Sequence, residues 1–436
     1  PLGIFVHWGP YSVPAWAEDH GELGVEEDWE AWFTHNSYAE WYFNTIRIPG
    51  SPAALRHKDL YGSASYDAFL DAWDPDAWDP AEWMRLFHRA GAGYAVLTTK
   101  HHDGVTLWDA PETGTRNTVR RGPCTDLVAG FADAARDEGL RVGLYYSGGL
   151  DWHYRPARPI LSEDDCKDLC RPKDADYARY CFVHVRDLID RYQPDVIWND
   201  LDWPDEGKDF GPYGLGTLCG YFYAARPEGV TNDRYGGVHA DYLTSEYQHM
   251  GDSETSGKPW ENCRGVGLSF GYNRAEGEHQ YLSGAGAVRH LVDVVSRGGR
   301  LLLNVGPKAD GPIPREQHEC LEGLGAWNDL YGSELRGVRP LSAAEVGALS
   351  AHTRDGQDEA WVRLLPHGDH LAVVADASVS AVLGLPQGFD YSRSATLTPG
   401  AACSWDGQSL TLQAGEQPPS DARGEALPLV VTAPRA

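Results

Sequence analysis

The chain has 436 residues, with 64 acidic against 37 basic side chains and a formal net charge of −27. This charge argues against nucleic acid or an anionic membrane as a partner, since both require a positive surface. No apolar run reaches the roughly 18 residues that span a membrane. The 16 Trp, 22 Tyr and 17 His are an unusual number of amphipathic rings, most of which we expect in the core.

The eight cysteines are scattered, without a CxxC pair or a Cys/His zinc spacing. We expect no metal and no cofactor. Cys166 and Cys170 lie four residues apart in a polar loop; a disulfide between them is the alternative to the favoured free thiols. Residues 1–9 already have a strand pattern, so any signal peptide has been removed or lies outside this sequence. We expect a cytoplasmic location, with secretion as the alternative.

Strand and helix patterns alternate from the start of the chain to residue 335. The predicted strands, in chain order, are at 2–8, 94–99, 140–147, from 196 to Asp200, 229–233, 241–246 and 300–305. The predicted helices are at 79–91, 125–139, 174–192, 212–225, from Ser283 onward, and 315–331, and the stretch at 28–44 is mainly helical. Asp79 as N-cap and Pro80 as the first helical residue make the helix at 79–91 the clearest.

Seven or eight strand-then-helix units predict an α/β fold for residues 1–335, a parallel sheet closed as a (β/α)8-like (TIM-type) barrel. We expect the barrel to be irregular around 229–246, where two strands follow each other closely. After Gly337 the pattern changes to short alternating runs separated by Gly, Pro and Asp. These runs predict an antiparallel β-sandwich for residues 336–436. Its strands are expected at 360–365, 370–374, 379–383, 409–413 and 428–432.

Several polar residues stand at or just beyond the carboxyl ends of the predicted strands, which in a barrel converge on one cleft. Asp200 follows the apolar run Val196-Ile197-Trp198, and Pro204 and Gly207 then force a loop. A carboxylate therefore stands at the tip of a buried strand. The other strand-end residues are His7, His101, His102, Tyr145, Trp198, Arg234 and Glu246.

Hydrolysis of a glycoside with retention needs two carboxyl groups about 5 to 5.5 Å apart, one as nucleophile and one as acid and then base. We choose Asp200 as the nucleophile and Glu246 as the acid, with Glu261 as the competing acid. Taken singly, each carboxylate fits a cap or an ion pair equally well. The adjacent His101 and His102 form a poor metal site if they follow strand geometry, because neighbours on a strand point to opposite faces. Hydrogen bonds to sugar hydroxyls are their favoured use, and a buried structural role is the alternative.

Seven motifs carry a resemblance to a known family. They are GIFVHWGPYSVPAW (3–16), AEWY (39–42), TTKHHDGVTLWD (98–109), GLYYSGGLDW (143–152), WNDLDWP (198–204), LSFGYNR (268–274) and GGRLLLNVGPKADGPIP (298–314). With these motifs in order along residues 3–335, the chain resembles the α-L-fucosidases of glycoside hydrolase family 29. The resemblance implies a retaining exo-glycosidase that removes terminal α-L-fucose, built as a (β/α) barrel with a C-terminal β-sandwich.

The resemblance also implies roles for individual residues. The nucleophile of the family matches Asp200, the acid/base matches Glu246, and the arginine before it matches Arg234. The fucose-binding residues match His7, Glu40, Trp41, His101, His102, Tyr145 and Trp198, and the aromatic residue beside the C6 methyl group matches Phe270. We expect a fucosylated oligosaccharide or glycoconjugate as the substrate, and the family often associates, so a homo-oligomer fits as well.

Our hypothesis is that Asp200 attacks C1 of the fucosyl unit while Glu246 protonates the leaving oxygen and then activates water. The alternatives are a catalytically silent fucose-binding protein, a metal-dependent barrel hydrolase and a retaining glycosidase that acts on galactosides. A galactoside carries a hydroxyl at C6, which a wall that includes Phe270 should reject. We expect the sandwich to brace the barrel rather than bind glycan, since only Trp361 and Trp405 stand out there.

Overall fold

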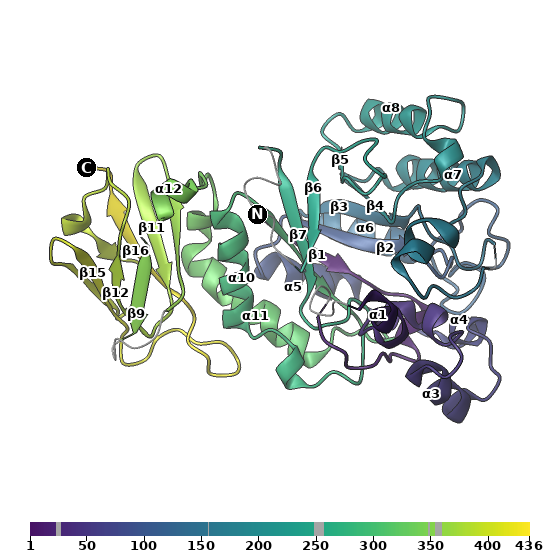
Figure 1. The fold of residues 1–436 in the computed structure, drawn as a ribbon, viewed down its shortest axis with the longest axis horizontal. Helices are drawn as coiled ribbons and strands as arrows, with labels where there is room; N and C mark the ends of the chain where they lie inside the picture. The colour runs from purple at the N-terminus through teal and green to yellow at the C-terminus, as the bar shows by residue number, and fades with distance from the viewer. Residues whose placement is uncertain (23–27, 156, 248–256, 348, 354–359) are drawn as a thin grey trace.

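The computed structural model describes residues 1–22, 28–155, 157–247, 257–347, 349–353 and 360–436. It has two parts: a sheet of parallel strands surrounded by helices, and a pair of antiparallel sheets formed by the C-terminal part of the chain (Figure 1). None of the helices in these ranges combines the length and the apolar character needed to cross a membrane.

Eight parallel strands make up the first sheet, in the order β5-β4-β3-β2-β1-β8-β7-β6. They are β1 (Leu2–Val6), β2 (Tyr94–Lys100), β3 (Arg141–Ser147), β4 (Val196–Asp200), β5 (Val230–Thr231), β6 (Leu243–Glu246), β7 (Trp260–Gly265) and β8 (Arg300–Val305). The sheet curls into a TIM-like barrel, which confirms the predicted fold. Its two edge strands are β5 and β6, and a backbone hydrogen bond of 3.1 Å from Asp241 N to Thr231 O joins these edges. The irregular part of the barrel is thus where the sequence placed it.

The sequence prediction misses β7 and makes β5 too long. The β7 sequence WENCRG has no apolar run, yet Glu261 and Asn262 are buried in it. It forms a strand because it pairs in parallel with both β6 and β8, so the surrounding sheet decides its conformation. The strand predicted at 229–233 shrinks to the two residues of β5.

Helices surround the sheet. They are α1 (Trp29–His35), α2 (Tyr42–Thr45), α3 (Pro52–Tyr61), α4 (Asp67–Ala72), α5 (Pro80–Arg89), α6 (Leu127–Asp137), α7 (Ala175–Tyr192), α8 (Leu215–Ala225), α10 (Gly284–Ser296) and α11 (Arg315–Tyr331), with the short helical turns η2 (Ala39–Trp41), η3 (Asp165–Leu169) and η6 (Gly332–Leu335). The predicted caps are present: the Asp79 carboxylate accepts the N–H of Ala81 and Glu82, and the Ser283 hydroxyl accepts that of Gly286. The stretch at 28–44 is divided among α1, η2 and α2.

The C-terminal part is the predicted antiparallel sandwich. Its sheets have the orders β10-β11-β16-β13 and β14-β15-β12-β9. The strands are β9 (Ser350–Thr353), β10 (Val362–Pro366), β11 (His370–Ala375), β12 (Val379–Leu383), β13 (Ala395–Thr396), β14 (Ala402–Trp405), β15 (Ser409–Gln413) and β16 (Leu429–Pro434), preceded by α12 (Ala343–Val346). Val373, Val382 and Leu412 belong to a core that both sheets share.

Helices α10 and α11 lie between the barrel sheet and the sandwich (Figure 1). Arg289 of α10 forms ion pairs with Asp376 and Glu425 of the sandwich, at 2.7 and 2.6 Å. The indole of Trp327 in α11 donates a hydrogen bond of 3.0 Å to the carbonyl of Pro428. These contacts hold the sandwich against the barrel.

Candidate active site

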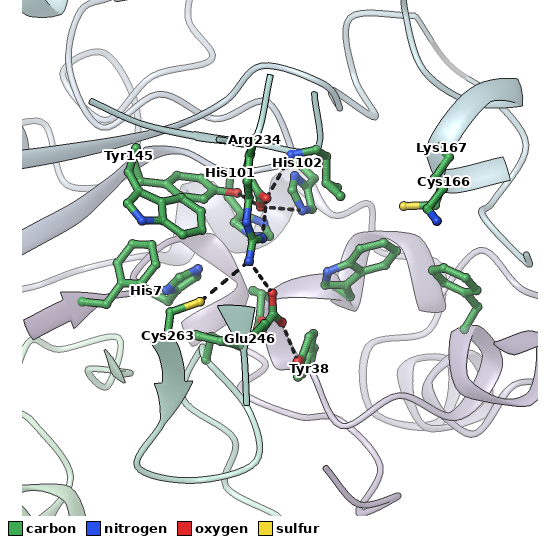
Figure 2. Close-up of a pocket in the computed structure, with 18 of the residues that line it drawn as sticks. His7, Tyr38, His101, His102, Tyr145, Cys166, Lys167, Arg234, Glu246 and Cys263 are labelled. Carbon is green, nitrogen blue, oxygen red and sulfur yellow. Dashed lines mark hydrogen bonds and ion pairs between the residues drawn. The ribbon is translucent and has the colours of Figure 1, made fainter. Parts of the chain in front are cut away.

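One pocket opens at the carboxyl ends of the barrel strands (Figure 2). Every residue that the sequence assigned to the site lines it: His7, Glu40, Trp41, His101, His102, Tyr145, Trp198, Asp200, Arg234, Glu246 and Phe270. The convergence of the carboxyl ends of parallel strands placed the strand-end residues correctly, and the family motifs supplied Glu40, Trp41 and Phe270.

Asp200 ends β4, and both of its carboxylate oxygens are hydrogen-bonded. Oδ2 accepts from the hydroxyl of Tyr145 at 2.8 Å, and Oδ1 accepts from Arg234 Nη1 at 2.8 Å. His102 Nε2 lies 3.8 Å from Oδ2. Burial alone would raise the pKa of Asp200, but Arg234, His102 and Tyr145 together outweigh burial and hold this pKa below its ordinary value. Asp200 is therefore kept as a carboxylate, the form that a nucleophile requires.

Glu246 ends β6 and shares Arg234 with Asp200. Its Oε2 accepts from Arg234 Nη2 at 3.0 Å, and its Oε1 accepts from the hydroxyl of Tyr38 at 2.8 Å. Figure 2 shows the Arg234 side chain at the centre of the pocket, with Glu246 and then Tyr38 on one side of it. The guanidinium also lies over the ring of Trp198, 4.6 Å from its centroid. Because a single guanidinium binds both carboxylates, they lie close together, as double displacement at one carbon requires.

Glu261, the competing acid in the sequence analysis, does not line the pocket. It stands near the start of β7, at the amino end of the barrel, and only 4% of the residue is exposed. Its carboxylate accepts hydrogen bonds from the hydroxyl of Tyr94 at 2.5 Å and from Trp198 Nε1 at 2.9 Å. Burial raises its pKa. Of the two candidate acids, Glu246 is the one that faces the pocket.

Three histidines present their rings to the pocket. His7 Nδ1 donates to Asn304 Oδ1 and His102 Nδ1 donates to Ser147 Oγ, both at 2.7 Å, which leaves each Nε2 as an acceptor. Burial lowers the pKa of His7 to about 3 and that of His102 to about 4, so both rings are neutral near pH 7. Neutral rings with one free lone pair suit the hydroxyl groups of a sugar.

His101 and His102 lie together because they belong to a loop, where the strand geometry that would separate them does not apply. Both residues follow the last residue of β2, where strand alternation no longer applies, and their ring centroids lie 4.0 Å apart. Burial lowers the pKa of His101 well below its usual value, and its buried Nδ1 has no hydrogen-bond partner among the described residues. A buried polar atom without a partner is costly, so His101 is also prepared to bind a polar ligand.

Glu40 and Phe270 complete the predicted set. Glu40 lies in η2, and its Oε2 accepts the N–H of Gly271 at 2.8 Å, which ties η2 to the loop after β7. Burial raises the pKa of Glu40 to about 7. The ring of Phe270 packs against those of His7 and Tyr38, with centroids 4.9 and 5.4 Å apart. The pocket thus pairs an acidic hydrogen-bonding group with an apolar wall.

Sequence reasoning missed several residues of the pocket. Tyr38 immediately precedes the AEWY motif, and this position was the only signal for it. Cys263 was missed together with β7; its sulfur lies 3.7 Å from Arg234 Nη2. Cys166 and Lys167 of η3 also line the pocket. Cys166 and Cys170 are both free thiols, so the structure does not contain the alternative disulfide.

A parallel barrel with two adjacent carboxylates and three neutral histidines at its carboxyl end has the arrangement of a glycoside hydrolase. Comparison with known proteins narrows this class. The family model described as alpha-L-fucosidase matches residues 1–333. The chain belongs to the α-L-fucosidase family.

Individual relatives agree with this assignment. An alpha-L-fucosidase of Dictyostelium discoideum is 29% identical over 390 residues, which cover 86% of this chain and 78% of that protein. Human plasma alpha-L-fucosidase is 31% identical over 341 residues, 77% of this chain and 67% of that protein. The structure of a Thermotoga maritima alpha-L-fucosynthase in complex with alpha-L-Fuc-(1-2)-beta-L-Fuc-N3 matches with a TM-score of 0.84 and 41% identity, over 99% of this chain and 94% of that one. The structure of a Thermotoga maritima alpha-fucosidase in complex with fucose matches with a TM-score of 0.82 and 40% identity. The match covers 99% of this chain and 95% of that chain.

Proposed function

We propose that this protein is a retaining, exo-acting α-L-fucosidase that releases terminal α-L-fucose from oligosaccharides or glycoconjugates. The observation that carries the proposal is the arrangement of Asp200 and Glu246 on the two terminal nitrogens of Arg234, at the carboxyl ends of β4 and β6. Double displacement uses two carboxyl groups that flank the scissile glycosidic bond, and Asp200 and Glu246 are such a neighbouring pair.

In the first step Asp200 attacks C1 of the fucosyl unit. The ion pair with Arg234 and the hydrogen bond from Tyr145 keep Asp200 ionised and fix its orientation. Glu246, which must carry a proton at this stage, gives it to the departing glycosidic oxygen. The bond from C1 to the leaving group breaks, and a covalent fucosyl-enzyme forms on Asp200.

In the second step Glu246 acts as a base. Now a carboxylate, it takes a proton from a water molecule, whose oxygen attacks C1 and displaces Asp200. Two inversions at C1 return the α configuration. Arg234 is a positioning residue in both steps, because it contacts each carboxylate and keeps their separation constant.

The remaining pocket residues suit the chemistry of fucose. The Nε2 atoms of His7 and His102 accept hydrogen bonds from hydroxyls, and the carboxyl group of Glu40 supplies a further polar contact. Phe270 supplies an apolar surface for the C6 methyl group. A galactoside would place its C6 hydroxyl against this apolar surface, where the hydroxyl loses its hydrogen bonds to water. This cost disfavours the galactosidase alternative.

The test is hydrolysis of an aryl α-L-fucoside by the wild type and by Asp200→Gly, with the matching β-D-galactoside as the substrate control. We expect the wild type to release fucose, and we expect the variant to be inactive until azide is added. Azide then occupies the space of the missing carboxylate and yields a fucosyl azide, which identifies Asp200 as the nucleophile.

Three outcomes would contradict the proposal. Fucose binding without turnover by the wild type would favour the silent binding protein. Loss of turnover in a chelator without any change of the melting temperature, with zinc restoring the turnover, would favour a metal-dependent hydrolase. Faster hydrolysis of the galactoside would favour the galactosidase. The cytoplasmic location and the homo-oligomer stay predictions.

A further inference from the structure

A second cluster of ionisable side chains lies where the barrel meets the sandwich. Glu334 belongs to η6, directly after the last barrel helix, and His367 and His370 flank the turn between β10 and β11. One ligand atom of each residue lies within 4.8 Å of the other two, and among the described residues no other trio of His, Cys, Asp or Glu meets this condition. All three residues follow the part of the chain that the family model matches, residues 1–333.

The hairpin turn brings the two histidines together. The backbone N–H of His367 donates to the carbonyl of His370 at 2.8 Å, which closes a two-residue turn over Gly368 and Asp369. The two rings consequently stack, with centroids 4.3 Å apart and planes inclined by 6°. Glu334 then approaches both rings from the barrel side: its Oε2 lies 2.7 Å from His370 Nε2 and 3.4 Å from His367 Nε2.

His367 is the member of the cluster whose ring Nε2 makes no hydrogen bond to any described residue. This atom is buried and meets Glu334 Oε2 only at 3.4 Å, and 10% of the side chain is exposed. Because buried polar atoms in folded proteins are nearly always hydrogen-bonded, a buried imidazole nitrogen with only this longer contact, beside a second imidazole, indicates a ligand.

Asp369 supplies the outer contact that metal-binding histidines usually have. Its Oδ1 lies 2.7 Å from His370 Nδ1. A carboxylate on Nδ1 fixes that nitrogen as the donor and directs the Nε2 lone pair into the cluster, which also makes Nε2 a better ligand. Asp369 itself is on the surface, with 90% of its side chain exposed.

We propose that Glu334, His367 and His370 bind one divalent transition metal ion, with Zn²⁺ as the expected ion. Two imidazoles and a carboxylate are a ligand set that zinc prefers, with water as the fourth ligand. Ligand atoms about 2.0 to 2.1 Å from a tetrahedral ion lie roughly 3.3 Å from each other. The separation between His367 Nε2 and Glu334 already has this size. When the ion enters, the shorter distance between Glu334 Oε2 and His370 Nε2 lengthens, and the two imidazole rings rotate out of their stack.

The ion would have a structural role. It joins η6 of the barrel to the β10–β11 hairpin of the sandwich, and none of its three ligands lines the active-site pocket. Binding therefore stabilises the docking of the two parts, and the inference is independent of the proposed fucosidase activity.

The test uses the full chain, stripped of metal with a chelator and titrated with Zn²⁺ alone by calorimetry, with metal content measured after gel filtration. We expect one tightly bound zinc per wild-type chain and a melting temperature that rises by a few degrees when zinc is added. His367→Gln should weaken zinc binding at least 100-fold and abolish the thermal shift. Asp369→Asn, on the exposed surface, should weaken it about 10-fold.

His318→Gln is the matched control, because His318 also lies beside a glutamate, Glu322 at 3.6 Å, but on the exposed face of α11. This variant should bind zinc like the wild type. The proposal is overturned if the wild type retains no zinc, or if His367→Gln binds it with unchanged affinity. Loss of zinc in His102→Gln but not in His367→Gln would place the ion in the pocket and would equally overturn it.

Discussion

Two glutamates on neighbouring parallel strands, Glu246 of β6 and Glu261 of β7, have similar hydrogen-bond partners at opposite ends of the barrel. Each carboxylate accepts one hydrogen bond from a tyrosine hydroxyl and one from a nitrogen donor. The partners are Tyr38 and Arg234 for Glu246, and Tyr94 and Trp198 for Glu261. The local chemistry of the two residues is nearly the same.

Their surroundings differ in two respects. The side chain of Glu246 is 21% exposed and faces the pocket, whereas Glu261 is almost completely buried and lines no part of it. The nitrogen donor of Glu246 is a cation that also binds Asp200. Position along the strand, rather than residue type, therefore decides which glutamate can do chemistry.

The largest effect should follow from Arg234→Met, which removes the cation between Asp200 and Glu246. We expect kcat/KM for an aryl fucoside to fall at least about 10³-fold, because the two carboxylates then repel each other and lose their common support. Arg226→Met is the matched control: Arg226 pairs with the single carboxylate of Asp195 at the amino end of the barrel. Equal losses in the two variants would mean that Arg234 has no special role.

Next in size is the exchange of either glutamate for glutamine. Glu246→Gln should lower kcat/KM about 10² to 10³-fold for a fucoside with a poor leaving group, and less for an activated aryl fucoside, because the proton donor is lost. Glu261→Gln should change these rates little, since its amide can still accept from Trp198 and donate to the Tyr94 hydroxyl oxygen. Steady-state kinetics on both substrates would show the opposite pattern if Glu261 were the acid.

The two tyrosines sharpen the same contrast. Tyr38→Phe removes a donor from Glu246, so we expect kcat/KM to fall about 10-fold. Tyr94→Phe leaves the buried Glu261 with one hydrogen-bond partner fewer and should lower the free energy of unfolding by about 1 to 3 kcal/mol, with kcat/KM little changed. Equal losses of kcat/KM in the two variants would contradict this prediction.

The smallest effect concerns the pH dependence of stability. Burial raises the pKa of Glu261 above 4.5, so the folded protein keeps a proton that the unfolded chain loses. Stability should therefore fall as the pH rises above about 4.5, by up to about 1.4 kcal/mol per pH unit, until Glu261 ionises in the folded state. The Glu261→Gln variant has no carboxyl group at this position, so it lacks this pH-dependent contribution to stability.

The measurement is urea unfolding of the wild type and of Glu261→Gln between pH 4 and 8. The free energy of unfolding of the variant should improve relative to that of the wild type as the pH rises. Two curves that stay parallel over this range would show that Glu261 keeps an ordinary pKa in the folded protein.

Apolar periodicity, turn residues and motifs were sufficient to predict the barrel, the sandwich and most of the pocket. Apolar runs such as Val196-Ile197-Trp198 can be stable only as buried strands, and turn residues mark where they end. Since the ends of parallel strands meet, Asp200, Glu246 and Arg234 could be assigned to one site before any contact was known. The family motifs then supplied Glu40 and Phe270, which lie outside the strands.

The tertiary structure decided what local patterns could not. The β7 segment is polar, and only its pairing with β6 and β8 makes it a strand. The choice of Glu246 over Glu261 depends on which end of the barrel each one occupies, and the role of Tyr38 depends on a contact across 208 residues. The cluster of Glu334 with His367 and His370 likewise joins two parts of the fold. In each case the deciding interaction is between residues distant in the chain, and periodicity and motifs report only on near neighbours.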